Sequence, residues 1–327
     1  MSPIIHVEQL RKYYDVPIRD AGFVQAVKSL VNRQYNTVKA VDGVSFDIEP
    51  GEVIGFLGPN GAGKTTTLKM LSGLLHPTSG SCTVLGYTPF ERDYAYLRQM
   101  TLVMGQRNNL LWDLPAGDTF ELARTIYGVA DSDYQHNKDA LIELLGLAPL
   151  MTKPVRNLSL GERMKCELIA ALLHEPKVLF LDEPTIGLDV VSQKVVREFL
   201  REHNKRRKTT ILLTSHYMAD IQELCDRVII IDRGTVFFDG RLNEILDRFA
   251  GFKIITVTLE QASGFASVPL ADLGEVLEQS PALARLKVAR ESVIATCKVL
   301  LDRLPVKDFA VEEVPIEDII RQVFEGR

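Results

Sequence analysis

The stretch that decides the fold is EVIGFLGPNGAGKTTTLKMLSGLL, residues 52–75. A short apolar run leads into a glycine turn that fits G-x-x-x-x-G-K-[ST], and a helical segment follows. The glycines let backbone N–H groups curl around phosphate oxygens, with no Cβ in the way. A lysine can then place its charge between the β- and γ-phosphates, and a threonine hydroxyl can ligate Mg²⁺. We therefore predict a phosphate-binding loop made of Gly58, Pro59, Asn60, Gly61, Ala62, Gly63, Lys64, Thr65 and Thr66.

A second candidate site lies in KVLFLDEPTIGLD, residues 177–189. Asp182 ends an apolar strand, where a carboxylate can hold Mg²⁺ directly or through water. Glu183 follows, and a carboxylate there can orient or deprotonate the water that attacks a γ-phosphate. The alternative is a solvated strand end, which the upstream lysine and threonine disfavour.

Short apolar strands alternate with amphipathic helices, which predicts an α/β fold with a mostly parallel sheet. In the helical stretch after residue 190, Val191, Val195, Val196, Phe199 and Leu200 recur at helical spacing and are expected to face the core. We expect a first domain over residues 1–244, with a helical subdomain at about 107–176. Residues 245–327 are expected to form a small α+β accessory domain, with strands at 252–259, 284–289 and 309–314 and helices at 292–304 and 315–326.

The bulk composition narrows the function. The chain has 327 residues and a formal net charge of −5, which disfavours a globally basic nucleic-acid binder. A local basic run, HNKRRK at 203–208, is better explained as a solvated helix end. The four cysteines form no metal-binding or paired spacing, which indicates free thiols in a reducing compartment. We expect no signal peptide, and no run of 18 apolar residues occurs.

The segment LSLGE, residues 158–162, begins a long amphipathic run and looks like a helix N-terminus. Such a start can bind an anion through free N–H groups and the helix dipole. Ser159 and Glu162 also fit the capping box S-x-x-E, which merely begins a helix. The two interpretations can coexist.

Taken together, these motifs resemble the ATP-binding subunits of ABC transporters over roughly residues 4–240. Residues 58–66 resemble the Walker A loop and residues 178–182 the Walker B strand, with Glu183 as the catalytic base. The resemblance also implies roles for Gln106 of the Q-loop, Asp189 of the D-loop and the switch histidine His216. Tyr14 fits the aromatic residue that stacks on adenine, and Tyr13 is the nearby alternative.

In that family two ATPase subunits pair head to tail with ATP between them. The resemblance implies that LSLGE is the signature, usually LSGGQ, and that it faces the Walker A loop of a second copy. Ser159, Gly161 and Glu162 would then contact the γ-phosphate across the interface, whereas Leu160 departs from the usual glycine. The resemblance implies Mg²⁺ held by Thr65, Gln106 and Asp182, and catalysis by Glu183, His216, Gln106 and Lys64.

Two features resemble the ABC-2 exporter group. One is the long insertion between Tyr14 and VKAVDGVSF, with a helix expected near residues 23–31 that touches the permease, touches the membrane or packs on its own domain. The other is the tail that ends in EEVPIEDIIRQVFEGR, residues 312–327. Leu110, Leu111 and Trp112 either line a groove for the permease or belong to the core.

The expected function is therefore ATP hydrolysis that drives export through a separate transmembrane permease, at the inner face of the cell membrane. A soluble ABC ATPase acting on nucleic acid or ribosomes is the main rival, and we expect no nucleic-acid partner. Only about 95 residues separate the phosphate loop from the signature, too few for the long coiled coil of the DNA-repair type, and only one ATPase half is present. A nucleotide-binding regulator without turnover is a second rival, against which Glu183 and His216 argue.

Overall fold

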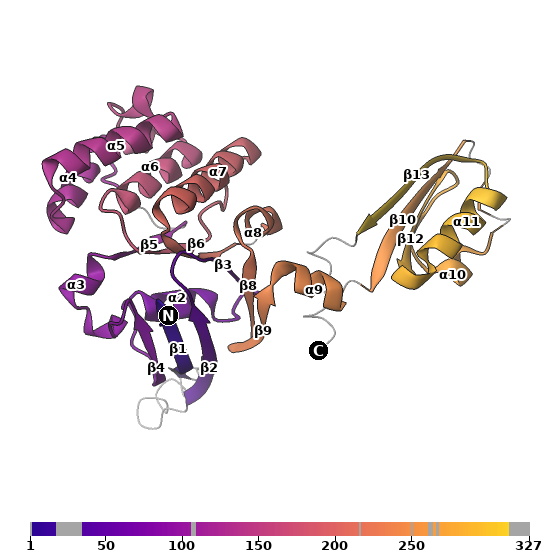
Figure 1. Ribbon diagram of the computed structural model, residues 1–327, viewed down its shortest axis with the longest axis horizontal. Coiled ribbons are helices and arrows are strands. Elements are labelled where there is room, and N and C mark those ends of the chain that lie inside the picture. The colour runs from indigo at the N-terminus through magenta and orange to yellow at the C-terminus, as the bar shows by residue number, and fades with distance from the viewer. Residues whose placement is uncertain are drawn as a thin grey trace, which may run out of the picture. The chain divides into compact units, whose positions relative to one another are not determined.

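The computed structural model describes residues 2–17, 35–105, 109–215, 217–249, 251–260, 264–265 and 268–313. The chain divides into two compact units, Met1–Gly240 and Arg241–Arg327. Figure 1 labels their helices and strands.

A six-stranded sheet in the order β5-β6-β7-β3-β8-β9 forms the centre of the first unit. Neighbouring strands from β5 to β8 pair in parallel, which confirms the predicted mostly parallel sheet. Short, almost wholly apolar segments suit such a sheet because both of its faces are covered. The strands are β3 Val53–Leu57, β5 Met100–Met104, β6 Val178–Asp182, β7 Thr210–Thr214, β8 Arg227–Asp232 and β9 Thr235–Arg241.

A second, antiparallel sheet has the order β2-β1-β4. Its strands are β1 Ile5–Pro17, β2 Tyr35–Ile48 and β4 Ser79–Val84. Both β1 and β2 continue into the segment between Tyr14 and Val38 that we took for an insertion. The helix expected near residues 23–31 lies outside the described residues.

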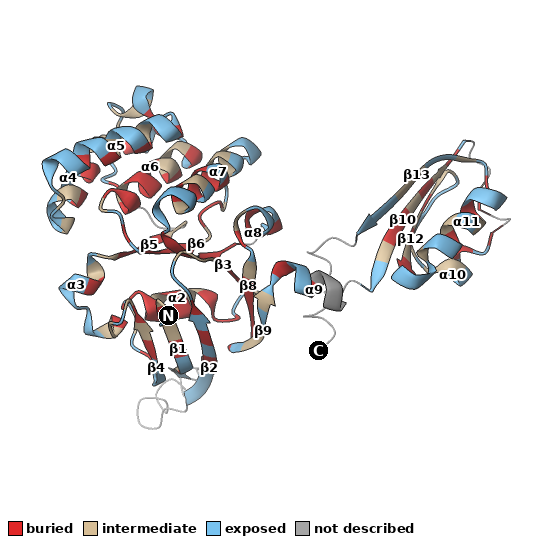
Figure 2. Ribbon diagram, in the orientation of Figure 1, coloured by how far each residue is buried: buried red, intermediate tan, exposed pale blue. Residues whose placement is uncertain are grey.

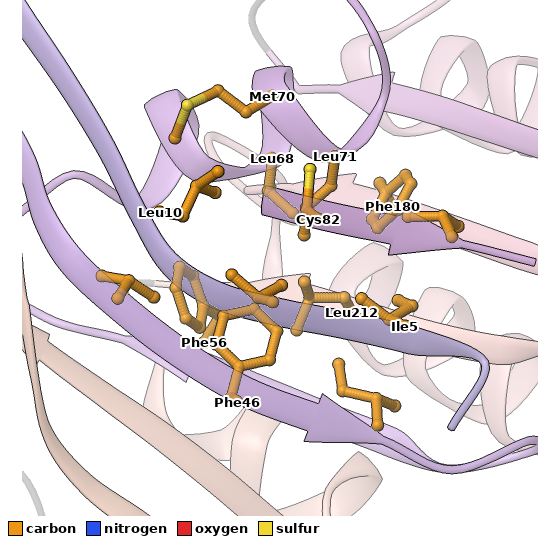
Figure 3. Packing of buried hydrophobic residues seen from close by; sticks show 14 of the residues in the cluster. Ile5, Leu10, Phe46, Phe56, Leu68, Met70, Leu71, Cys82, Phe180 and Leu212 are labelled. Carbon is orange, nitrogen blue, oxygen red and sulfur yellow. The ribbon is translucent and has the colours of Figure 1, made fainter. Parts of the chain in front are cut away.

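The core of this unit forms where α2 Lys64–Leu71 packs with both sheets. Leu68 and Leu71 of α2 share one buried cluster with Phe46 of β2, Phe56 of β3 and Phe180 of β6 (Figure 3). The rings of Phe46 and Phe56 lie 5.8 Å apart between centroids. This packing fixes α2, and therefore the glycine loop before it, at the end of β3.

Helices occupy most of the chain between β5 and β7. Three of them, α4, α5 and α6, lie before β6, and no strand occurs in residues 109–176, all of which the structure describes. Figure 2 shows that α4 and α5 expose one face and bury the other. Besides α2, the described helices of the first unit are η1 Pro89–Glu91, α3 Tyr94–Leu97, α4 Ala116–Tyr127, α5 Asp131–Leu145, η2 Ala148–Leu150, η3 Val155–Asn157, α6 Leu160–Leu172, α7 Val190–Arg207 and α8 Met218–Leu224.

The predicted core stripe of α7 is wrong at its first residue. Val191 is 73% exposed, whereas Val196, Phe199 and Leu200 are buried. Val191 lies in the first turn of α7 on a side that no neighbouring element covers, so the helical period alone misplaces it.

The second unit is a four-stranded sheet in the order β11-β12-β10-β13, packed with α11. Ile255, Val257 and Leu259 alternate along β10 and share one buried cluster with Leu300 of α11. The elements are α9 Leu242–Phe249, β10 Phe252–Leu259, α10 Leu270–Leu273, β11 Glu275–Gln279, β12 Leu283–Ala289, η4 Arg290–Ser292, α11 Val293–Arg303 and β13 Val306–Glu313. Strand β11 has no alternating apolar pattern that would predict it, because nearly all of its side chains are exposed. The helix expected at 315–326 lies outside the described residues.

Across the parts of the chain that are described, every helix is too short or too polar to cross a lipid bilayer.

Candidate active site

The phosphate loop connects β3 to α2 and depends on three glycines with positive φ. Gly58, Gly61 and Gly63 have φ values of 155°, 81° and 107°. A Cβ on Gly58 would lie 2.2 Å from the carbonyl oxygen of Ile231, and a Cβ on Gly63 would lie 2.4 Å from that of Ala40. The loop therefore tolerates no side chain at either position, for steric as well as conformational reasons.

Lys64 is the first residue of α2 and is buried. Its Nζ donates hydrogen bonds to the carbonyl oxygens of Gly58 (2.6 Å) and Pro59 (3.1 Å), so the ammonium lies inside the loop. The pKa of Lys64 is lowered, mainly by desolvation, and the carboxylates of Glu183 and Asp182 offset part of this shift. A buried ammonium at a helix N-terminus is suited to hold an anion.

Thr65, one residue further along α2, meets the acidic end of β6. Its hydroxyl donates to Asp182 Oδ2 at 2.9 Å and lies 3.1 Å from Oδ1. The Thr214 hydroxyl at the end of β7 donates to Asp182 Oδ1 at 2.8 Å. A carboxylate and a hydroxyl at this spacing are the oxygen donors that Mg²⁺ prefers, so these residues fit the metal that the motifs imply.

Glu183 follows β6 in a left-handed backbone conformation, with φ of 55°. Its N–H donates to the Thr214 carbonyl oxygen at 3.1 Å and to the Thr214 hydroxyl at 3.0 Å. A Cβ on Gly105 would lie 2.1 Å from the Glu183 carbonyl oxygen, so the chain after β5 closes against it. Left-handed conformations of non-glycine residues cost about 1–3 kcal/mol and occur where the surroundings enforce them, often at active sites.

Tyr14 lies on β1 and pairs with Val38 of β2. Val38 is two residues from Ala40, whose carbonyl oxygen abuts Gly63 of the phosphate loop. The Tyr14 side chain is 39% exposed, and Lys12 Nζ lies 5.3 Å from its ring centroid. The Tyr13 hydroxyl donates instead to Asp42, an interaction that raises the pKa of Tyr13. The two rings thus differ, and that of Tyr14 is the one with no hydroxyl partner among the described residues.

The signature residues form a separate group with the D-loop. Ser159 is the N-cap of α6 and forms a capping box: its Oγ accepts from the Glu162 N–H at 3.2 Å, and Glu162 Oε2 accepts from the Ser159 N–H at 2.8 Å. This hydrogen bond lowers the pKa of Glu162. Asp189 is the N-cap of α7 and accepts from Ser192 N at 2.9 Å.

Gly161 lies where the N-termini of α6 and α7 pack against each other. A Cβ at Gly161 would lie 2.5 Å from Ser192 Oγ, so the glycine lets α6 approach α7. A Cβ on Gly187 would lie 3.0 Å from Leu160 Cδ2, so the unusual signature leucine contacts the D-loop of its own chain. Packing between α6 and α7 of the same chain therefore accounts for a glycine at position 161. Whether its backbone also approaches a ligand remains a prediction.

Two predicted site residues, Gln106 and His216, lie outside the described residues, and their roles stay predictions. The residue before each of them is described: Gly105 follows β5 directly, and Ser215 follows β7 directly. The ends of these two strands adjoin the end of β6 in the same sheet.

Leu110, Leu111 and Trp112, which were expected to line a permease groove or to belong to the core, differ in burial. A cavity of about 680 Å³ lies between α3 and β5 on one side and α4 and α6 on the other. Leu110, Leu111 and Trp112 do not line it: Leu110 is buried in the core, and Trp112 is 47% exposed with the Arg163 guanidinium 5.3 Å from its ring centroid. The apolar lining comes from Leu97, Met100, Leu102, Val103, Leu122, Ala123, Ile126, Tyr127, Ala170 and Ala171.

Sequence reasoning missed two buried carboxylates near the site. Glu167 of α6 accepts hydrogen bonds from the N–H groups of Asn109 (2.6 Å) and Leu110 (3.2 Å), and burial raises its pKa. Asp220 of α8 is fully buried and forms an ion pair with Arg197 of α7, 3.1 Å between Oδ1 and Nη1. A charged residue inside an amphipathic helix gives no sign of burial until its partner is known.

Comparison with known proteins gives matches over both units. The family described as "ABC transporter" matches residues 41–186, and the family described as "EvrA-like ABC transporter, C-terminal domain" matches residues 251–312. The ABC transporter ATP-binding protein NatA of Bacillus subtilis is 37% identical over 64% of this chain and 85% of that protein. The linearmycin resistance ATP-binding protein LnrL of the same species is 31% identical, over 79% and 82%.

A Nod factor export ATP-binding protein I of Burkholderia pseudomallei is 36% identical over 69% of this chain and 74% of that protein. Among solved structures, an ATP-binding subunit of an ABC transporter superposes with a TM-score of 0.62 at 26% identity, covering 75% of this chain and 93% of that one. A dimeric ATP-binding cassette with ADP and Pi has a TM-score of 0.60 at 20% identity, over 73% and 98%, which indicates the shared fold.

Proposed function

Because the chain belongs to the ATP-binding proteins of ABC transporters, we propose that it hydrolyses ATP between two copies of itself and thereby drives a separate membrane permease. It is an ATPase of the P-loop type. The observation that carries the proposal is the convergence of Lys64, Thr65, Asp182 and Glu183 at the ends of β3 and β6.

ATP enters with its phosphates on the loop of residues 58–66. The backbone N–H groups of the glycine turn and the Lys64 ammonium bind the β- and γ-phosphate oxygens. Lys64 already donates to two carbonyl oxygens of the loop, so it exchanges these acceptors for phosphate oxygens without leaving the site. The exposed ring of Tyr14 stacks on adenine.

Thr65 and Asp182 would hold Mg²⁺ together with Gln106. The ion supplies charge neutralisation for the phosphate oxygens. The Thr65 hydroxyl and the Asp182 carboxylate are already within 3.1 Å of one another, and Thr214 fixes the second carboxylate oxygen. The chain therefore presents these donors with little rearrangement.

Glu183 accepts a proton from the attacking water as the new P–O bond forms, and the bond to the β-phosphate oxygen breaks. The left-handed backbone of Glu183 and its two hydrogen bonds to Thr214 fix the backbone position from which the carboxylate side chain extends. His216 follows Ser215 at the neighbouring strand end and positions the γ-phosphate.

The second half of each pocket comes from a second copy. Ser159 begins α6 and Asp189 begins α7, and both lie in one exposed group held together by Gly161 and Ser192. The N-terminus of α6 offers N–H groups and the positive end of the helix dipole to a γ-phosphate. Head-to-tail pairing would bring this group to the Lys64 loop of the other copy, and hydrolysis would release it.

The permease is expected at the 680 Å³ cavity, because its lining is mostly apolar and open. Arg92 and Arg98 stand at its edge without a carboxylate partner among the described residues, which suits an amphipathic segment that carries an acid. The subunit would then sit at the cytoplasmic face of the membrane. The resistance and export functions in the names of the relatives favour export as the direction.

The decisive experiment uses the Glu183→Gln variant of the full chain. We expect steady-state ATP hydrolysis to fall by about two orders of magnitude or more, since the general base is lost. ATP binding should persist, and the variant should accumulate as an ATP-bound dimer in sedimentation experiments. Hydrolysis at the wild-type rate would refute the assignment of Glu183 as the base.

A permease test uses Ile126→Asp, which places a charge in the cavity lining. ATP hydrolysis by the isolated subunit should be unchanged, while co-purification with its permease is lost. The matched control is Leu144→Asp on α5, an exposed leucine outside that lining. Equal retention of the permease by both variants would contradict the assignment of this cavity.

A further inference from the structure

A buried ion pair, Arg197 with Asp220, lies behind the active site and contacts nothing that binds nucleotide directly. Asp220 is fully buried, and Arg197 is buried on α7. Arg197 Nη1 donates to Asp220 Oδ1 at 3.1 Å, and Arg197 Nε lies 3.0 Å from Glu223 Oε1. Burying such a pair costs desolvation free energy, so its net effect on stability is small or unfavourable. Its presence calls for another explanation.

The second oxygen of Asp220 holds two hydroxyls. Thr185 Oγ1 and Ser215 Oγ both donate to Asp220 Oδ2, the latter at 2.5 Å. Thr185 is two residues beyond Glu183, and Ser215 is one residue beyond β7. The carboxylate therefore ties together the two loops that leave β6 and β7 at the active-site edge of the sheet.

The loop after β6 begins with the strained residue. Glu183 has φ of 55°, and Ile186 N–H donates back to the Glu183 carbonyl oxygen at 3.2 Å, so residues 183–186 form a tight turn. Two hydrogen bonds to Thr214 hold its N–H side. On the C-terminal side, the Thr185 side chain has one hydrogen-bond acceptor among the described residues, the carboxylate of Asp220.

We propose that Thr185, Asp220 and Arg197 form a clamp that keeps Glu183 in its left-handed conformation and so positions the catalytic base. Arg197 orients the Asp220 carboxylate, Asp220 accepts from Thr185, and Thr185 fixes the turn that follows Glu183. These are positioning residues, since all three side chains are buried and none belongs to the groups assigned to ATP binding. A conformation that costs free energy persists only while its surroundings enforce it.

The proposal rests on the function of Glu183 as the base, and it makes a specific kinetic prediction. Losing the clamp lets the turn relax, so the carboxylate spends less time in reach of the attacking water. Small misplacements of a reacting group reduce the rate by about tenfold to a hundredfold. ATP binding should not change, because the Lys64 loop has its own support from Ile231 and Ala40.

The test is Thr185→Val, which replaces the hydroxyl by a methyl group of similar size. We expect kcat for ATP hydrolysis to fall at least about tenfold, with KM and ATP affinity within about twofold of wild type. Thr185→Ser keeps the hydroxyl and should recover most of the lost rate. Thr125→Val is the matched control and should keep the wild-type kcat, since within the described residues that hydroxyl bonds only the Glu121 carbonyl oxygen of its own helix.

A double variant separates positioning from a general loss of structure. In a Glu183→Gln background, Thr185→Val should reduce the residual hydrolysis by less than about twofold, because the group it positions is already gone. If Thr185→Val fails to fold, Thr185→Ala removes the hydroxyl without adding a methyl and is measured in the same way.

Three results would overturn the clamp: an unchanged kcat in Thr185→Val, an equal loss in Thr185→Ser, or a full further loss on the Glu183→Gln background. Normal hydrolysis by Glu183→Gln itself would instead refute the base assignment, whatever Thr185 does. The failure of the clamp and the failure of the proposed function are thereby distinguished.

Discussion

Replacing Ser159 with aspartate separates two roles of one side chain. In the structure Ser159 caps α6 through a 3.2 Å hydrogen bond from the Glu162 N–H. Aspartate is as good an N-cap as serine, so the start of the helix should be preserved. In the proposed dimer, however, Ser159 faces the γ-phosphate bound to the other copy, and aspartate places a negative charge there.

The size of the effect follows from Coulomb's law. Two unit charges about 4 Å apart at an effective dielectric constant of about 20 repel by about 4 kcal/mol. That corresponds to roughly a thousandfold weaker ATP-dependent dimer for each site. By contrast, Ser159→Ala loses only the cap, which costs about 1 kcal/mol and lowers the melting temperature of a unit this large by about 2–4 °C.

The assay is sedimentation of the full chain with ATP, in the Glu183→Gln background that stabilises the dimer. Ser159→Asp should melt within about 2 °C of its parent and yet remain monomeric at concentrations where the parent dimerises. Ala130→Asp, which adds the same charge at the exposed N-cap of α5, should dimerise normally. A Ser159→Asp variant that dimerises like its parent would refute the composite pocket.

Two further predictions concern the fold around the site. Gly105→Ala should lower kcat and should lower the free energy of unfolding by about 1–3 kcal/mol, because the new Cβ would lie 2.1 Å from the Glu183 carbonyl oxygen. A variant with the wild-type rate and melting temperature would contradict this close packing. Burial lowers the pKa values of His174 and His203 from 6.5 to about 4. As the pH falls, these two histidines are therefore protonated in the unfolded chain before they are protonated in the folded chain. Stability should thus be greatest above pH 6.5 and fall towards pH 4, by about 2 kcal/mol per histidine at pH 5. Urea unfolding at pH 7 and pH 5 measures this loss of stability. The loss should be smaller in the double variant His174→Gln, His203→Gln. An equal loss in that variant would exclude the two histidines as the cause.

Much of the nucleotide site could be predicted from sequence because its parts are local. The glycine turn, Lys64 and Thr65 follow one another in the chain, and their chemistry depends on that order. Asp182 and Glu183 stand at the end of an apolar strand, and parallel strands place such ends at one edge of a sheet. The capping box of Ser159 and Glu162 depends only on a spacing of three residues and is present as predicted.

The tertiary structure decided what depends on neighbours far apart in the chain. The sequence does not show that Thr185 donates to Asp220, that Arg197 balances this carboxylate, or that Glu183 adopts a left-handed backbone. Each partner lies on a different element, and its own segment is an ordinary loop or amphipathic helix. Val191 illustrates the same limit, since helical spacing gives a direction but not whether a neighbour covers it. The chain alone determined which chemical groups are present at the site; only packing, through burial and long-range hydrogen bonds, decided how those groups are held.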